Sequence, residues 1–97
     1  MELPIKFRLG SGAYSVVRMT SLPRGMVGQV RYGPRIIEIA MGPTNKPRPT
    51  RKVSETFWHE TTHAILYDMN HRLWRNEAFV KEFSKRLNQV VLSARLP

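Results

Sequence analysis

Two histidines and a glutamate in the segment His59-Glu60-Thr61-Thr62-His63 have the residue types and the spacing of a metal site. On a helix, residues four positions apart lie on one face about one turn apart, so both imidazoles can reach a single metal ion. Imidazole nitrogens are common ligands of tetrahedral zinc. The carboxylate beside them, that of Glu60, can take a proton from water that such a metal activates.

This pattern, His-Glu-x-x-His, is typical of zinc-dependent peptidases. It predicts hydrolysis of peptide bonds through a metal-activated water, with a peptide or protein as the substrate. We therefore expect zinc as the cofactor, one ion per chain, held by His59 and His63, with Glu60 as the catalytic base. A catalytic zinc keeps three protein ligands and one open position, so a third ligand must come from another part of the chain.

Two residues beyond the motif are candidates for the third ligand. Asn76 is a good cap for a second helix, which places Glu77 in its first turn. A short turn makes the two helices antiparallel neighbours, so Glu77 can come back towards His63. Glu77 is therefore the first choice. His71 is the alternative, if the motif helix ends early and the chain folds back.

Apolar periodicity predicts two helices that position these side chains, at about residues 50–69 and 76–94. The apolar side of the first helix consists of Phe57, Trp58, Thr61, Ala64 and Ile65. The two histidines lie on its opposite side, so we expect a helix sandwiched between a sheet and the element that shares the metal. Tyr67 follows His63 by one turn, where it either hydrogen-bonds in the site or packs its ring. The apolar stripe of the second helix consists of Phe79, Val80, Phe83, Leu87, Val90, Val91 and Ala94.

The residues before the motif helix predict a short sheet. Four runs of strand-forming residues, between turn signals, fall within residues 3–41. Three prolines then make residues 42–49 an exposed loop. The expected fold class is α+β, with an antiparallel sheet of three or four strands followed by two packed helices. Residues 1–97 are expected to form one domain.

The fourth run is a candidate substrate-binding strand. If it lies at the edge of the sheet, an extended peptide can pair with its backbone. An ordinary strand inside the sheet is equally compatible with the pattern. The residues concerned are Arg35, Ile36, Ile37, Glu38 and Ile39.

Two segments resemble small phage and bacterial HExxH metallopeptidases: Glu55–Ile65 and Asn76–Leu87. They look like minimal gluzincins, related in plan to the peptidase domains of ImmA/IrrE-type proteins. In that plan a short antiparallel sheet precedes the motif helix, and the next helix begins with a Glu followed by apolar residues three and six positions later. Glu77, Val80 and Phe83 match this spacing. The resemblance implies a minimal zincin-like fold with Glu77 as the third zinc ligand.

The net charge of +9, from 16 Lys and Arg against 7 Asp and Glu, favours acidic partners. Nucleic acid is one such partner, although charged runs usually only solvate a surface. An alternative function follows: a catalytically inactive zincin-fold module that holds zinc structurally and contacts nucleic acid or a host protein. A third interpretation is a small α+β domain whose histidines are only partly buried polar residues.

The composition also bears on the compartment. No apolar run approaches the roughly 18 residues that span a bilayer, and the first residues lack the plan of a signal peptide. The chain has no cysteine, which leaves a zinc site to His and carboxylate ligands. We therefore expect no membrane partner and a cytoplasmic protein, in the cytoplasm of a host cell if it is phage-encoded.

Overall fold

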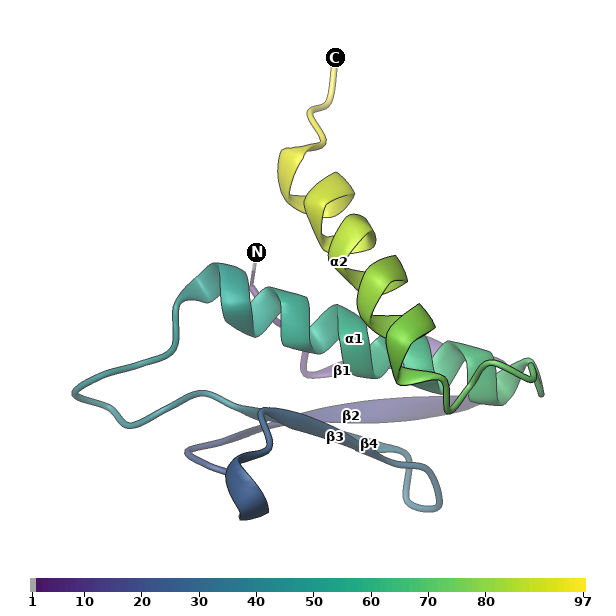
Figure 1. Cartoon of the computed structure of the whole chain (residues 1–97), viewed down its shortest axis with the longest axis horizontal. Helices are drawn as coiled ribbons and strands as arrows, with labels where there is room; N and C mark the ends of the chain where they lie inside the picture. Colours follow the sequence, from purple (N-terminus) through teal and green to yellow (C-terminus); the bar gives the residue numbers. More distant parts are fainter. Residues whose placement is uncertain (1) are drawn as a thin grey trace.

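A computed structural model, which describes residues 2–97, consists of a four-stranded sheet with two helices stacked on one face (Figure 1). This is the α+β class that the sequence predicts. Neither helix is long and apolar enough to cross a membrane. The elements in chain order are β1 (Lys6–Leu9), β2 (Gly12–Met19), a 3-10 turn η1 (Pro23–Gly25), β3 (Gly28–Arg31), β4 (Ile36–Ala40), α1 (Thr50–Asp68) and α2 (Glu77–Ser93).

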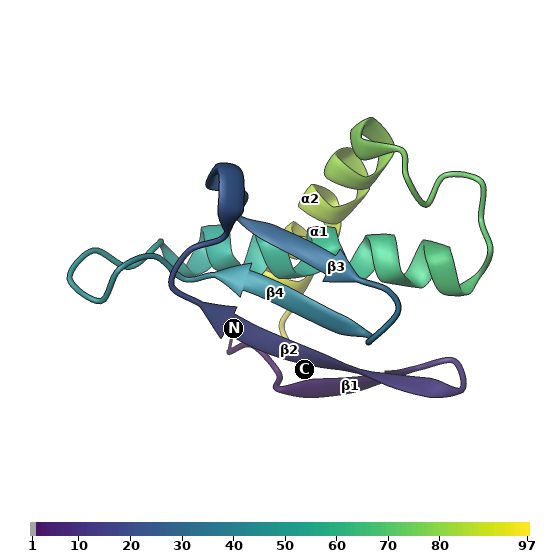
Figure 2. The ribbon, with the colours of Figure 1, turned by 90° about the horizontal axis from the view of Figure 1, so that it is seen from below.

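The sheet is mixed, which corrects the prediction of an antiparallel one. Its strand order is β1-β2-β4-β3 (Figure 2). β1 pairs with β2 and β3 pairs with β4 in antiparallel fashion, whereas β2 and β4 are parallel. β4 takes the inner place because its Ile37 and Ile39 are fully buried, while β3 offers Gly28, Gln29 and Arg31 at the edge. Burial of the more apolar strand therefore decides the order.

Of the two interpretations of the fourth run, the structure excludes the substrate-binding edge and agrees with an ordinary strand inside the sheet. β4 forms backbone hydrogen bonds with β2 on one side and with β3 on the other. A peptide has no unpaired backbone groups to join there. The edge strand beside α1 is β3. The residues that the prediction named are Arg35 in the turn before β4, and Ile36, Ile37, Glu38 and Ile39 within it.

α1 packs its apolar side on the inner face of the sheet. It begins directly after Pro49, and no side chain caps its first turn. It ends where Asn70 adopts a left-handed conformation with φ 53°, and the His71 N–H donates to the Leu66 carbonyl over 2.9 Å. The shared core consists of Leu3, Tyr14, Val16, Ile37, Ile39, Val53, Phe57 and Ala64.

α2 packs on α1 through Val80 and through small polar side chains, which corrects the predicted apolar contact in part. Its buried residues are Val80, Ser84 and Asn88. The Ser54 hydroxyl of α1 donates to Asn88 Oδ1 over 2.6 Å, inside this contact. Serine at positions 54 and 84 leaves room for the helices to approach closely. The predicted stripe therefore faces partly outward, with exposed fractions of 37%, 49% and 62% for Phe79, Phe83 and Val90.

Candidate metal centre

His59 and His63 lie on the same side of α1, with ring centroids 5.0 Å apart. The four-residue spacing on a helix produces this arrangement. The His63 side chain is only 7% exposed and that of His59 is 24% exposed. The His63 ring is therefore almost fully enclosed, whereas the His59 ring remains partly open to solvent.

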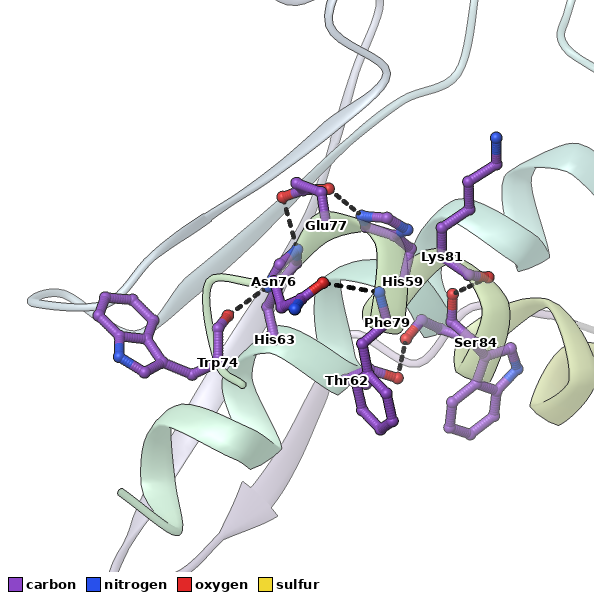
Figure 3. A network of polar contacts seen from close by, with 10 residues as sticks. His59, Thr62, His63, Trp74, Asn76, Glu77, Phe79, Lys81 and Ser84 are labelled. Atoms are coloured by element: carbon purple, nitrogen blue, oxygen red, sulfur yellow. Dashed lines mark hydrogen bonds and ion pairs between the residues drawn. The ribbon is translucent and has the colours of Figure 1, made fainter. Parts of the chain in front are cut away.

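Glu77 joins the two histidines from the first turn of α2 (Figure 3). Its Oε2 lies 3.0 Å from His59 Nε2, and its Oε1 lies 2.9 Å from His63 Nε2. The Asn76 side chain caps α2 by accepting from the Phe79 N–H over 2.9 Å, as predicted, and so sets where the helix begins. One ligand atom from each of the three residues lies within 4.8 Å of the others, so the group could hold a metal ion.

The surroundings of His63 suit a metal ligand. Its Nδ1 lies 2.6 Å from the Trp74 carbonyl oxygen. Because a carbonyl only accepts, Nδ1 carries a proton, and in a neutral ring the lone pair that can bind a metal then lies on Nε2. Glu77 Oε1 lies 2.9 Å from Nε2, a contact that needs a positive charge between the two atoms, either a metal ion or a second proton on the ring. A carbonyl behind the ring is the usual support of a metal-binding histidine.

Glu60 is buried beside this cluster, with an exposed fraction of 9%. Burial, and secondarily the negative charge of Glu77, raises the pKa of the Glu60 carboxyl from 4.5 to about 7. A carboxyl with such a pKa both accepts and donates a proton near neutral pH. Glu60 therefore has the properties of a proton acceptor beside a group that could hold a metal ion.

Gly28 of β3 makes room for Glu60. A Cβ at this glycine would lie 2.6 Å from Thr56 Cγ2, 3.0 Å from Glu60 Cγ and 3.1 Å from Glu60 Oε2. At Gly28 the edge strand β3 therefore passes close to the Glu60 side chain. No spacing rule in the sequence identifies such a contact, because it depends on which strand passes over the helix.

A hollow of about 490 Å³ opens over the cluster. α1 contributes His59, Glu60 and His63 to its lining, and the start of α2 contributes Glu77. The remaining walls come from the region of β3 and from the connector between the helices. Their residues are Met26, Gly28, Gln29, Val30 and Tyr32, and Trp74 and Arg75.

Tyr67 packs its ring and makes no side-chain hydrogen bond within residues 2–97. Its centroid lies 4.3 Å from that of Tyr32 and 5.0 Å from that of Trp74. Burial, above all, raises the pKa of Tyr32 to about 12, so this phenol stays protonated at neutral pH. The geometry favours the packing interpretation of Tyr67, and it adds Tyr32 and Trp74 to the surroundings of the site.

His71 lies outside the cluster, in the connector between the helices. Its Nδ1 accepts from the Leu73 N–H over 3.1 Å, so the ring stabilises the turn. α1 ends at Asp68, so the helix does end before Met69, but His71 is not part of the group that could hold a metal ion. Between the two candidates for the third ligand, the geometry therefore favours Glu77.

Comparisons of the chain with protein-family models, with curated proteins and with solved structures find no significant match. The resemblance to gluzincins therefore stays a prediction. Support for a function comes from the residues and their geometry.

Proposed function

We propose that this chain is a zinc-dependent metallopeptidase with a minimal gluzincin-like site. The observation that supports this most strongly is the convergence of two imidazole Nε2 atoms and one carboxylate beside the buried Glu60. Two histidines and one glutamate are the ligand set of several catalytic zinc sites, which keep a fourth position for water. The partial exposure of His59 and Glu77 leaves such a position accessible from the hollow.

In this proposal His59, His63 and Glu77 hold the ion. Bound zinc supplies a Lewis acid that polarises the scissile carbonyl and makes water more acidic. Glu60 accepts a proton from water while the water oxygen forms a bond to the carbonyl carbon. The same carboxyl then delivers the proton to the amine nitrogen as the carbon–nitrogen bond breaks. One water is consumed, and an acid and an amine are released.

β3 replaces β4 as the strand that an extended substrate would join. Its outer edge has no strand beside it, and Gly28 and Gln29 line the hollow. A peptide paired with this edge lies alongside Glu60, because Gly28 is packed against that side chain. Backbone pairing would contribute affinity, and the walls of the hollow would select side chains.

Glu60→Gln tests the proposal. The amide preserves size but cannot accept a proton, so we expect one zinc per chain in both proteins and a loss of hydrolysis of about 100-fold or more. Zinc is measured by elemental analysis and hydrolysis by mass spectrometry of a mixed peptide library. Equal hydrolysis by the two zinc-loaded proteins, or none by the wild type, would refute peptidase function.

The second candidate is the basic binding module, which the net charge of +9 favours. In that case zinc only joins α1 to α2, and the surface contacts nucleic acid or an acidic protein. A nucleic-acid affinity that falls steeply with salt, and that is the same for the wild type and Glu60→Gln, would support it. If the protein hydrolyses peptides and has no salt-dependent affinity for nucleic acid, the result would favour the peptidase function over the binding module.

A further inference from the structure

The connector between the helices holds Trp74 firmly at the rim of the hollow. Its carbonyl oxygen is bound to His63 Nδ1 at 2.6 Å, and its N–H donates to the His71 carbonyl over 3.1 Å. The indole ring packs edge-on against Tyr67 and Tyr32, with centroids 5.0 and 5.3 Å away. Trp74 is thus fixed through both its backbone and its ring.

Arg75 uses this ring as a support. Its guanidinium carbon lies 4.6 Å from the centroid of the Trp74 ring, a cation–π contact that restricts a flexible side chain. Arg75 also lines the hollow. No carboxylate within residues 2–97 forms an ion pair with it. A positioned cation therefore lines the hollow, and its side chain donates no hydrogen bond to any of the described residues 2–97.

The charges of the hollow make this cation significant. Glu60 and Glu77 together balance a divalent ion, whereas the part of the lining near β3 carries no charged residue. With a divalent metal bound and both carboxyls ionised, the charges of the metal and the two carboxylates cancel. Arg75 then gives the lining of the hollow a net positive charge. The protein as a whole is also strongly basic, so it attracts anionic ligands from a distance.

We propose that Arg75 binds a carboxylate of the peptide substrate and so determines specificity. A guanidinium offers two parallel N–H donors that match the two oxygens of a carboxylate. The carboxylate comes either from an Asp or Glu side chain near the scissile bond or from the C-terminus of the peptide. This inference rests on the proposed peptidase function, and it assigns that site a class of acidic substrates.

Binding to zinc-loaded Glu60→Gln protein tests the inference without cleavage. The ligands are short peptides of alanine and leucine, acetylated at the N-terminus and studied by isothermal titration calorimetry. One pair of C-terminally amidated peptides differs only by Glu against Gln. A second pair has no acidic side chain and differs only by a free or an amidated C-terminus.

We expect one pair to show a preference of about tenfold for the carboxylate, in line with a charge-assisted hydrogen bond. A preference in the first pair identifies a side-chain carboxylate, and a preference in the second identifies the C-terminus. Arg75→Gln, made in the same background, should abolish the preference while the protein still holds one zinc. Arg75→Lys keeps the charge but loses the two parallel N–H donors, so it should retain part of the preference.

Arg72→Gln is the matched control. Arg72 is exposed in the same connector but does not line the hollow, so this variant should keep the full preference. No preference in either pair, or a preference that survives Arg75→Gln, would overturn the inference. Hydrolysis by the wild type is measured separately. Cleavage without a carboxylate preference contradicts only the role of Arg75, whereas a preference without any cleavage contradicts only the peptidase function.

Discussion

At the residue scale, the hydrogen bond between His63 and the Trp74 carbonyl has the largest consequences. It places the proton on Nδ1 and directs Nε2 towards Glu77. The ring is also 93% covered, so it cannot easily turn to another partner. A ligand held in this way loses little conformational freedom when a metal binds, which favours affinity.

Glu77→Gln separates the two candidates for the third ligand. The Glu77 side chain is 73% exposed, so the change should leave the fold intact. We expect the zinc dissociation constant to rise by about 100-fold or more. Removal of a metal ligand weakens binding more than removal of a residue that only hydrogen-bonds to a ligand. His71→Gln is the control and should bind zinc as the wild type does. A competition titration with a chromophoric chelator measures both, and a larger loss in His71→Gln would contradict the assignment.

Glu60 should make the metal-free protein less stable as the pH rises. Its carboxyl has a pKa of about 7 in the folded chain and about 4.5 when unfolded, so the folded state retains the proton longer. Below pH 4.5 the raised pKa therefore does not lower the free energy of unfolding. Between pH 4.5 and 7 the free energy of unfolding falls progressively. The decrease reaches at most about 3 kcal/mol above pH 7.

Urea denaturation in the presence of a chelator measures this effect, with Glu60→Gln as the reference. The amide does not titrate, so the variant should gain stability relative to the wild type as the pH rises from 4.5 to 8. Parallel stability curves for the two proteins over this range would show that the Glu60 carboxyl is not buried as described.

At the element scale, β3 and α1 together position the proposed base. Gly28→Ala places a methyl group against Thr56 and Glu60, so the Glu60 carboxylate must move. We expect unchanged zinc content and up to about a 100-fold fall in the rate of hydrolysis, as for a misplacement of about 1 Å. Gly33→Ala is the control because a Cβ there meets nothing within 4 Å.

A double variant identifies which contact causes the effect. Thr56→Ser removes the Cγ2 atom but keeps the hydroxyl that donates to the Lys52 carbonyl over 3.0 Å. Combined with Gly28→Ala, Thr56→Ser removes the shortest contact of the new methyl group, which is with Thr56 Cγ2. The contacts of that methyl group with Glu60 remain. The loss of hydrolysis should therefore persist in the double variant. Full recovery would assign the effect to Thr56 and not to the base.

The helices could be predicted from the sequence more fully than the sheet. Helical periodicity and the cap at Asn76 are local signals, and they placed the two histidines opposite Glu77. Strand order depends on contacts between distant residues, and the apolar residues of β4 are compatible with an inner strand without identifying its neighbours. The Trp74 carbonyl could not be predicted either, because every residue carries a carbonyl. The contact of Gly28 with Glu60 likewise requires knowledge of the edge strand.

At the scale of the whole molecule, the cluster of His59, His63 and Glu77 joins α1 to α2 across a polar helix contact. The sheet and α1 share the apolar core, whereas α2 leaves part of its apolar side exposed. The C-terminal part of α2 extends away from the sheet (Figure 1). In a small domain such a contact contributes limited stability. A metal ion bound by residues of both helices should therefore stabilise the folded chain.

Zinc should raise the melting temperature, since an ion that binds only the folded state stabilises it by mass action. At a free concentration of about 100 times the dissociation constant the gain is about 2.7 kcal/mol. For a domain of this size, that corresponds to an increase of about 10 °C or more. Differential scanning calorimetry with zinc and with a chelator measures the change. His59→Ala should show no response, and an equal response in that variant would place the ion elsewhere.

An anomalous-difference map of zinc-reconstituted crystals, recorded at the zinc absorption edge, tests the central claim most directly. We predict one peak per chain at about 2.0–2.2 Å from His59 Nε2, His63 Nε2 and a carboxylate oxygen of Glu77. Glu60 should lie beside the peak without coordinating it. Absence of a peak between these three residues, or a peak that includes His71 in place of Glu77, would contradict the account.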